Sequence, residues 1–184
     1  MVIAVKKGEE IVVGISTIDN YGGMTAKDKL LADNVPCWKV YGEDDCFVFS
    51  DRATLISDVL RYNSHVFRGI TDYNSVVNKV VPKIKDLLSG MNCLLQDEIM
   101  NTKLVIVKGN KVYFINYDFM VADIDEWVAT DRREYIGGAY EVSKHLSPED
   151  IVLFAYRNAV GYDSNPFPLI VFDNHSKKQR VVNS

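Results

Sequence analysis

The chain opens with two apolar runs, Val2-Ile3-Ala4-Val5 and Ile11-Val12-Val13-Gly14-Ile15, joined by the polar segment Lys6-Lys7-Gly8-Glu9-Glu10. Each run has the length of a β-strand, and the glycine in the polar segment suits a turn, so the stretch predicts a β-hairpin. Apolar residues occupy consecutive positions instead of alternating with polar ones, which indicates that both faces of the hairpin are covered.

Two further hairpins follow the same pattern along the chain. They are Cys37–Tyr41 with Cys46–Phe49, and Leu104–Val107 with Val112–Ile115. Short extended pieces are expected at 119–121 and 126–128, and a last strand at 167–172. The polar residues 174–184 are expected to form a loose C-terminal tail, so we predict a single domain over residues 1–173.

Helical patterns separate these strands into groups. Ser50 is a candidate N-cap for a helix that contains Leu55, Ile56, Val59 and Leu60. A second helix is expected over residues 74–89, with a kink or break at Pro82. One helix is expected to begin after Ile136-Gly137-Gly138, and Ser147-Pro148 is typical of the start of another. Strands that come as hairpins, with helices grouped between them, predict an α+β fold with antiparallel sheets.

Composition excludes several classes of protein. The chain has 184 residues, of which 47% are hydrophobic and 25% are charged, which is enough apolar sequence for a substantial core. The net charge of −4 argues against a nucleic-acid-binding protein. No apolar run has the length of a membrane span, and the N-terminal residues do not resemble a secretory signal. Three sparse cysteines, Cys37, Cys46 and Cys93, suit a reducing cytoplasm.

The order and spacing of these segments resemble the proteasome β-subunit and HslV family of N-terminal-nucleophile hydrolases. The resemblance rests on Ile3–Gly8 with Ile11–Gly14, on the hairpin that ends at Phe49 before a helix, on the 104–115 hairpin, and on Ile136-Gly137-Gly138. It covers most of the chain and implies a four-layer αββα sandwich. It also implies assembly into a ring or dimer and, through a chain-initial Thr, peptide hydrolysis by way of an acyl-enzyme.

The resemblance assigns the catalytic positions one by one. Met1 or Val2 lies where the nucleophile belongs, and Ser16 lies where the family has an Asp. Lys39 is a candidate for the activating Lys, although a second alignment puts Pro36 there. Ile136-Gly137-Gly138 matches the family's Ser-Gly-Gly element without its hydroxyl.

Met1 and Val2 carry neither a hydroxyl nor a thiol, so the ordinary family mechanism cannot start there. We therefore expect a catalytically degenerate, cytoplasmic protein that acts by self-assembly or partner binding, without a cofactor or a metal. Two alternatives stay open: an active threonine-type hydrolase with an unorthodox or processed nucleophile, and an unrelated α+β binding domain.

Other reactive side chains are better explained by ordinary structural roles. Thr17 and Ser16 could serve as other nucleophiles, but strand-end hydroxyls usually bond to the backbone. Thr25 could do so only if processing created a new N-terminus there. Asp19 is a displaced candidate for the family Asp that matches Ser16. The histidines His65, His145 and His175 are isolated in sequence. Asp123, Asp125 and Glu126 lack the spacing of a calcium loop and are expected to be solvated.

Overall fold

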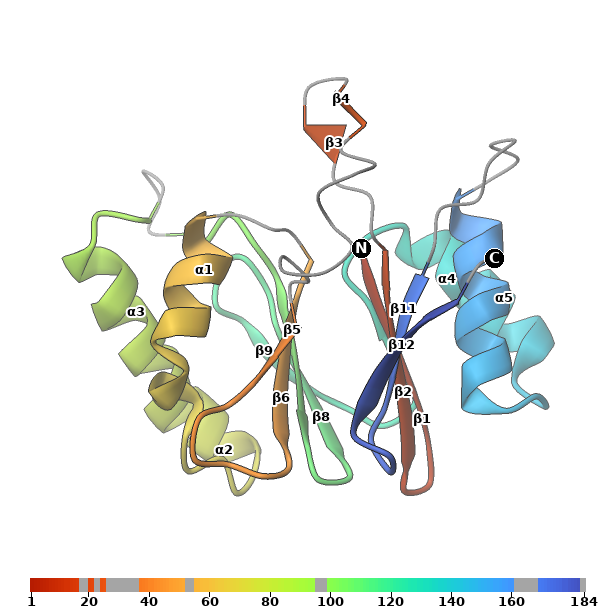
Figure 1. The fold of residues 1–184 in the computed structure, drawn as a ribbon, viewed down its shortest axis with the longest axis horizontal. Coiled ribbons are helices and arrows are strands. Elements are labelled where there is room, and N and C mark those ends of the chain that lie inside the picture. Colours follow the sequence, from red (N-terminus) through yellow and green to blue (C-terminus); the bar gives the residue numbers. More distant parts are fainter. Residues whose placement is uncertain are drawn as a thin grey trace. The chain divides into compact units, whose positions relative to one another are not determined.

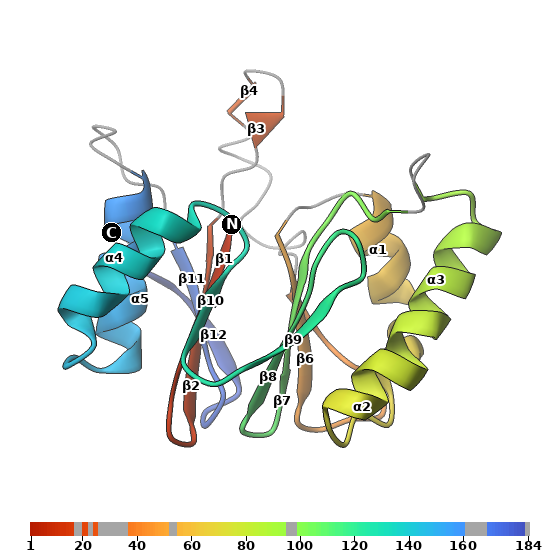
Figure 2. The same cartoon turned by 180° about the vertical axis from the view of Figure 1, so that it is seen from behind.

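The computed structural model describes residues 1–16, 20–21, 24–25, 37–51, 55–94, 99–160 and 169–182, with the backbone alone at 20–21, 24–25 and 160. The chain divides into two compact units. Unit 1 comprises residues 1–35 and 125–184, and unit 2 comprises residues 36–124. Figure 1 and Figure 2 show the elements of both units from opposite sides.

Unit 1 is built on a five-stranded sheet in the order β10-β1-β2-β11-β12. Its strands are β1 (Val2–Lys7), β2 (Glu10–Ser16), β10 (Trp127–Ala129), β11 (Leu169–Asp173) and β12 (Lys178–Val182). All pairings in this sheet are antiparallel, and the predicted β1–β2 hairpin places Ala4 opposite Val13. The short strands β3 (Asn20–Tyr21) and β4 (Met24–Thr25) pair with each other.

Two helices, α4 (Arg133–Ser143) and α5 (Pro148–Val160), cover one face of this sheet (Figure 1). Ser147 caps α5 as predicted, because its Oγ accepts the backbone N–H of Asp150 at 3.2 Å. Helix α5 packs closely on β2 because Gly14 has no side chain: a Cβ there would lie 2.5 Å from Val152 Cγ1. The Lys7 ammonium donates to the carbonyls of Lys144 and Leu146, just after the C-terminal end of α4, where cations are favourable.

Unit 2 is built on a second five-stranded antiparallel sheet in the order β5-β6-β7-β8-β9. Its strands are β5 (Cys37–Lys39), β6 (Cys46–Ser50), β7 (Leu104–Lys108), β8 (Lys111–Ile115) and β9 (Val121–Ile124). Ser50 is the last residue of β6 instead of the predicted helix cap, since its buried hydroxyl lies 2.7 Å from Thr102 Oγ1.

Helices cover one face of this sheet and share a core with it. They are α1 (Leu55–Tyr62), the 3₁₀ turn η1 (Ser64–Phe67), α2 (Tyr73–Ser75), the π-helical segment η2 (Val76–Val80) and α3 (Val81–Gly90). The break expected at Pro82 takes the form of the π segment, in which Val81 N–H donates to Val76 O. A wider turn before Pro82 lets the helix continue past the proline.

The expected α+β class with antiparallel sheets and grouped helices is confirmed by these two units. The prediction of a loose C-terminal tail is wrong, because residues 178–182 form β12, which pairs with β11 along its whole length. The strand was not predicted because Val181 and Val182, which favour a strand, lie among polar residues. The boundary of the single domain at residue 173 stays a prediction. Within the described residues, no helix is long and apolar enough to cross a membrane.

Candidate functional site

The candidate site is the head of β1, where the sequence analysis places the nucleophile position. The carbonyl of Met1 accepts the N–H of Ser16 at 2.9 Å. The N–H of Val2 donates to Thr130 Oγ1 at 2.9 Å, and the N–H of Thr130 donates to the Val2 carbonyl at 3.0 Å. Met1 is partly exposed, whereas Val2 and Thr130 are buried. The main chain of Val2 is therefore bonded into the sheet.

The side chains at this position limit its chemistry. Met1 ends in a thioether and Val2 in methyl groups, and neither has a proton that a base could remove. Thr130 is 1% exposed and its hydroxyl oxygen accepts the Val2 N–H, so the hydroxyl supports the strand. Thr130 was missed by the sequence analysis, because its contact with Val2 spans most of the chain.

Ser16, where the family has an acid, bonds to a different group. Its side chain forms a hydrogen bond with Tyr156 of α5, and the Tyr156 side chain is fully buried. Burial raises the pKa of Tyr156 above its ordinary value, although the bond to Ser16 acts in the opposite direction. The phenol therefore stays protonated at neutral pH and cannot act as a base. The Ser16–Tyr156 pair joins the end of β2 to α5.

Lys39 belongs to unit 2 and has a partner within its own hairpin. Its ammonium lies 2.7 Å from Asp44 Oδ1, and both side chains are more than half exposed. Lys39 therefore forms a local ion pair, as exposed lysines commonly do. Pro36, the other candidate for this position, lies outside the described residues, as do Thr17 and Asp19.

The expected helix start after Ile136-Gly137-Gly138 is wrong, because α4 already begins at Arg133. Ile136 N–H donates to the Arg132 carbonyl inside the helix, so its amide does not point toward a ligand. Gly137 allows the ring of Trp127 to approach, since a Cβ there would lie 3.2 Å from two ring atoms. The low helix propensity of the two glycines misled the sequence analysis, and packing against Trp127 overrides it.

The turn that precedes α4 is Thr130-Asp131-Arg132. Arg132 adopts a left-handed backbone with φ of 50°, which is uncommon outside glycine. Its guanidinium donates to the Ala159 carbonyl near the end of α5. A strand followed directly by Thr and Asp is a recognisable signal for a helix start, and it would have placed this turn correctly.

The remaining sequence candidates are surface residues. His65, His145, His175, Asp123, Asp125 and Glu126 are all exposed. In the part of the chain that the structure covers, no three His, Cys, Asp or Glu side chains form a group that could hold a metal. Thr25 lies in β4, for which only the backbone is described.

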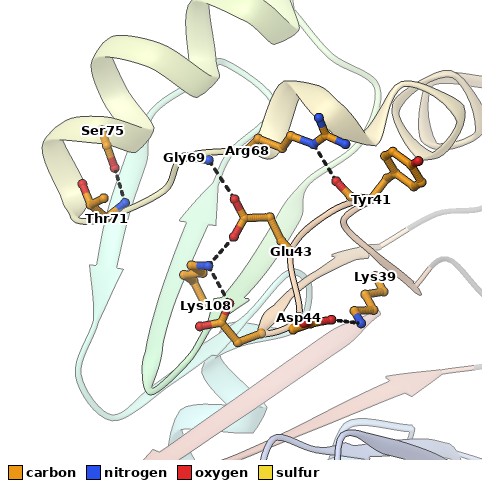
Figure 3. A network of polar contacts seen from close by, with 10 residues as sticks. Lys39, Tyr41, Glu43, Asp44, Arg68, Gly69, Thr71, Ser75 and Lys108 are labelled. Atoms are coloured by element: carbon orange, nitrogen blue, oxygen red, sulfur yellow. Dashed lines mark hydrogen bonds and ion pairs between the residues drawn. The ribbon is translucent and has the colours of Figure 1, made fainter.

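A separate polar network lies at the hairpin tips of unit 2 (Figure 3). The Lys108 ammonium lies 2.5 Å from both Glu43 Oε2 and Asp45 Oδ1, and Glu43 Oε1 also accepts the N–H of Gly69. Partial burial lowers the pKa of Lys108, but the hydrogen bonds that its ammonium donates to the carboxylates of Asp45 and Glu43 raise it. The net effect is a raised pKa for Lys108. The same bond to Lys108 lowers the pKa of Glu43. We call Lys108, Glu43 and Asp45 the Lys108 clasp.

The chain is similar to known proteins in its structure but not in its sequence. No family model matches the sequence, and no curated protein matches it. Solved structures match nearly the whole chain. BPH from Thiobacillus denitrificans, solved in complex with epoxomicin, gives a TM-score of 0.73 at 16% identity and covers 94% of this chain and 96% of its own.

Two further structures are similar to the chain. HslV from Trypanosoma brucei gives a TM-score of 0.64 at 14% identity, over 94% of this chain and 97% of its own. Anbu, described as an ancestral β-subunit, from Yersinia bercovieri gives 0.66 at 12% identity, over 100% of this chain and 87% of its own. The chain therefore has the proteasome-like N-terminal-nucleophile hydrolase fold, as the sequence resemblance implied.

Proposed function

We propose that this protein is a catalytically degenerate member of its fold, which acts by self-assembly or by binding a partner protein. The observation that carries the proposal is the chemistry at the head of β1. Met1 and Val2 offer no hydroxyl or thiol, and the Val2 amide is bonded to Thr130. We further propose a cytoplasmic location, on the sequence argument from the sparse cysteines.

The positions around the nucleophile support the same interpretation. A hydrolase of this kind needs a base and a charged group that lowers the pKa of the nucleophile. Ser16 supplies a hydroxyl bonded to Tyr156 where an acid would be needed. Lys39 is bonded to Asp44. Each of these residues thus has a structural partner, and none requires a substrate to explain its placement.

The outer face of α4 supports the assembly part of the proposal. Tyr135 is 64% exposed and Val142 is 65% exposed, and their spacing of seven residues puts them on one side of the helix. Gly138 lies between them, and a Cβ built on it meets nothing within 4 Å. Exposed apolar side chains gathered on one helix face are typical of a contact surface.

Catalysis is tested by incubating the purified protein with peptide substrates and with epoxomicin, and then measuring turnover and intact mass. We expect no turnover and no adduct, because the side chains of Met1 and Val2 have no hydroxyl or thiol that could form an acyl-enzyme. BPH from Thiobacillus denitrificans, which was solved in complex with epoxomicin, serves as the positive control. A covalent adduct on any residue, together with turnover, would support the hydrolase alternative instead.

Assembly is tested by light scattering over a range of protein concentrations. We expect a mass above that of one chain, and we expect the paired substitutions Tyr135→Glu and Val142→Glu to lower it. Val181→Glu is the matched control, because Val181 is also half exposed but lies on β12. A wild-type mass equal to one chain at every concentration would contradict self-assembly.

A further inference from the structure

Arg68 in unit 2 is held in one position by two contacts with Tyr41 (Figure 3). Its Nε donates to the Tyr41 carbonyl at 2.6 Å, and its Cζ lies 4.9 Å from the centre of the Tyr41 ring. Its Nη2 lies 2.8 Å from the place that a Cβ on Gly42 would take, so the guanidinium lies across bare backbone. We call Tyr41, Gly42 and Arg68 the Arg68 platform.

The outer edge of this guanidinium is not used within the described residues. No ion pair of the described part of the chain involves Arg68, and its only side-chain hydrogen bond there is the one from Nε. A guanidinium has five N–H donors in a fixed plane, so the two terminal nitrogens can still take a carboxylate in a bidentate manner. The platform is therefore an ordered cation without an acidic partner among these residues.

The surface around the platform has the composition of a contact site. Tyr41 itself is 76% exposed. The backbone of Tyr41 is fixed by Ser64, whose Oγ accepts the Tyr41 N–H at 3.1 Å. Tyrosine and arginine are enriched among the residues that contribute most to binding in protein interfaces.

The same chain carries a segment of opposite charge. Asp123, Asp125 and Glu126 are exposed, and none of them forms an ion pair among the described residues. Glu126 accepts a hydrogen bond from the Tyr140 side chain and interacts electrostatically with Lys144, so the carboxylates left for a partner are those of Asp123 and Asp125. This segment, residues 123–126, begins within the last positions of β9 and leads into β10. The ordered Arg68 and the exposed carboxylates of Asp123 and Asp125 are of opposite charge and complement each other between two copies.

We propose that the Arg68 platform docks the acidic segment 123–126 of a second copy of this chain. The inference rests on the proposed function, and it identifies one contact by which the protein self-assembles. A nucleic acid is a poorer occupant, because the net charge of −4 opposes a polyanion with many phosphates. Across a two-fold axis this contact forms twice and gives a dimer, and in a head-to-tail arrangement it builds a closed ring or an open chain.

Charge reversal on each side tests the contact in the full chain. Arg68→Glu, and separately Asp123→Arg with Asp125→Arg, should each weaken association roughly 30-fold or more in light scattering or sedimentation. Lys83→Glu is the matched control for the first variant: Lys83 is an exposed cation of unit 2, and the same change in net charge should leave the mass unchanged.

Mixing the two charge-reversed proteins provides the decisive measurement. At one contact in the mixture, the charge-reversed platform of the first protein meets the charge-reversed segment of the second. At the other contact, the unchanged platform of the second protein meets the unchanged segment of the first. The mixture should therefore regain the wild-type mass, and misfolding cannot produce this rescue. If the wild type assembles but the charge reversals have no effect, or the mixture stays dissociated, the docking contact is overturned and self-assembly stands. If the wild type has the mass of one chain throughout, the docking contact and self-assembly are both overturned.

Discussion

Replacing Lys108 by Met removes the ammonium of the Lys108 clasp but keeps a straight side chain of similar length. The clasp joins the tip of the β5–β6 hairpin to the β7–β8 hairpin, and Glu43 extends it to Gly69. Without Lys108, the carboxylates of Glu43 and Asp45 are left beside each other with no cation between them. We expect the substitution to destabilise the fold.

The size of the effect follows from charge and exposure. A hydrogen bond to a charged group contributes about 1.5–3 kcal/mol, whereas an exposed ion pair contributes about 0.2–1 kcal/mol. Lys108 and Glu43 are about one-fifth exposed, but Asp45 is 46% exposed, so only the bond to Glu43 approaches the larger value. The expected loss is about 2 kcal/mol, or roughly 4–8 °C in Tm for a chain of this size.

The dependence on pH identifies the cause. The pKa of Glu43 is lowered in the fold, so its contribution is present above the ordinary pKa of about 4.3 and is lost as the pH falls through the lowered value. The pKa of Lys108 is raised, so its contribution is lost only as the pH rises past about 10.4 and through the raised value. The difference between wild type and variant should be largest between these limits.

Thermal unfolding followed by circular dichroism at pH 3, 5, 7 and 9 measures this difference. Glu43→Gln, alone and combined with Lys108→Met, completes a double-mutant cycle and isolates the pair. Lys111→Met is the control, because Lys111 is exposed at the start of β8. A loss of less than about 0.5 kcal/mol at pH 7, or an equal loss at pH 3 and pH 7, would refute the argument.

Two further predictions concern close packing and thiol reactivity. Gly14→Ala should cost about 1–3 kcal/mol in chemical denaturation, because the new Cβ would lie 2.5 Å from Val152 Cγ1; Gly90→Ala, where the space is open, should cost nothing, and equal effects would contradict the packing argument. Iodoacetamide should modify only Cys93 in the native protein, since burial raises the pKa of Cys46 to about 12 and raises that of Cys37 further. Mass spectrometry of tryptic peptides checks this, and rapid labelling of Cys37 would contradict it.

The sequence predicts the sheets better than it predicts the ends of the helices. Apolar runs flanked by turn residues located the hairpins of β1–β2, β5–β6 and β7–β8, because strand pairing within a hairpin is local. The predicted start of the helix that contains Gly137 and Gly138 was too late, because helix propensity alone disfavours glycine inside a helix. Its true start depends on Trp127, which packs on Gly137 from a neighbouring strand.

The candidate site could be predicted only in part. The residues at the head of β1 follow from the turn at Gly8 and the β1–β2 register, and they lie where the sequence places them. The partners of these residues do not follow from local sequence. Thr130 follows the end of β10 and Tyr156 lies in α5, and only tertiary structure brings them to Val2 and Ser16. The catalytic roles assigned by resemblance, and their loss here, stay predictions.

The division of the chain into units has a consequence for synthesis on the ribosome. Unit 2 is continuous, so residues 36–124 all emerge before the second part of unit 1 is made. Unit 1 needs the first residues and the last: β1 waits for β10, and β2 waits for β11. Because chains fold as they are made, the apolar β1–β2 hairpin spends the longest time with both of its edges open. Protection of this nascent hairpin, by a chaperone or by the ribosome itself, would therefore matter more for yield than any step within unit 2.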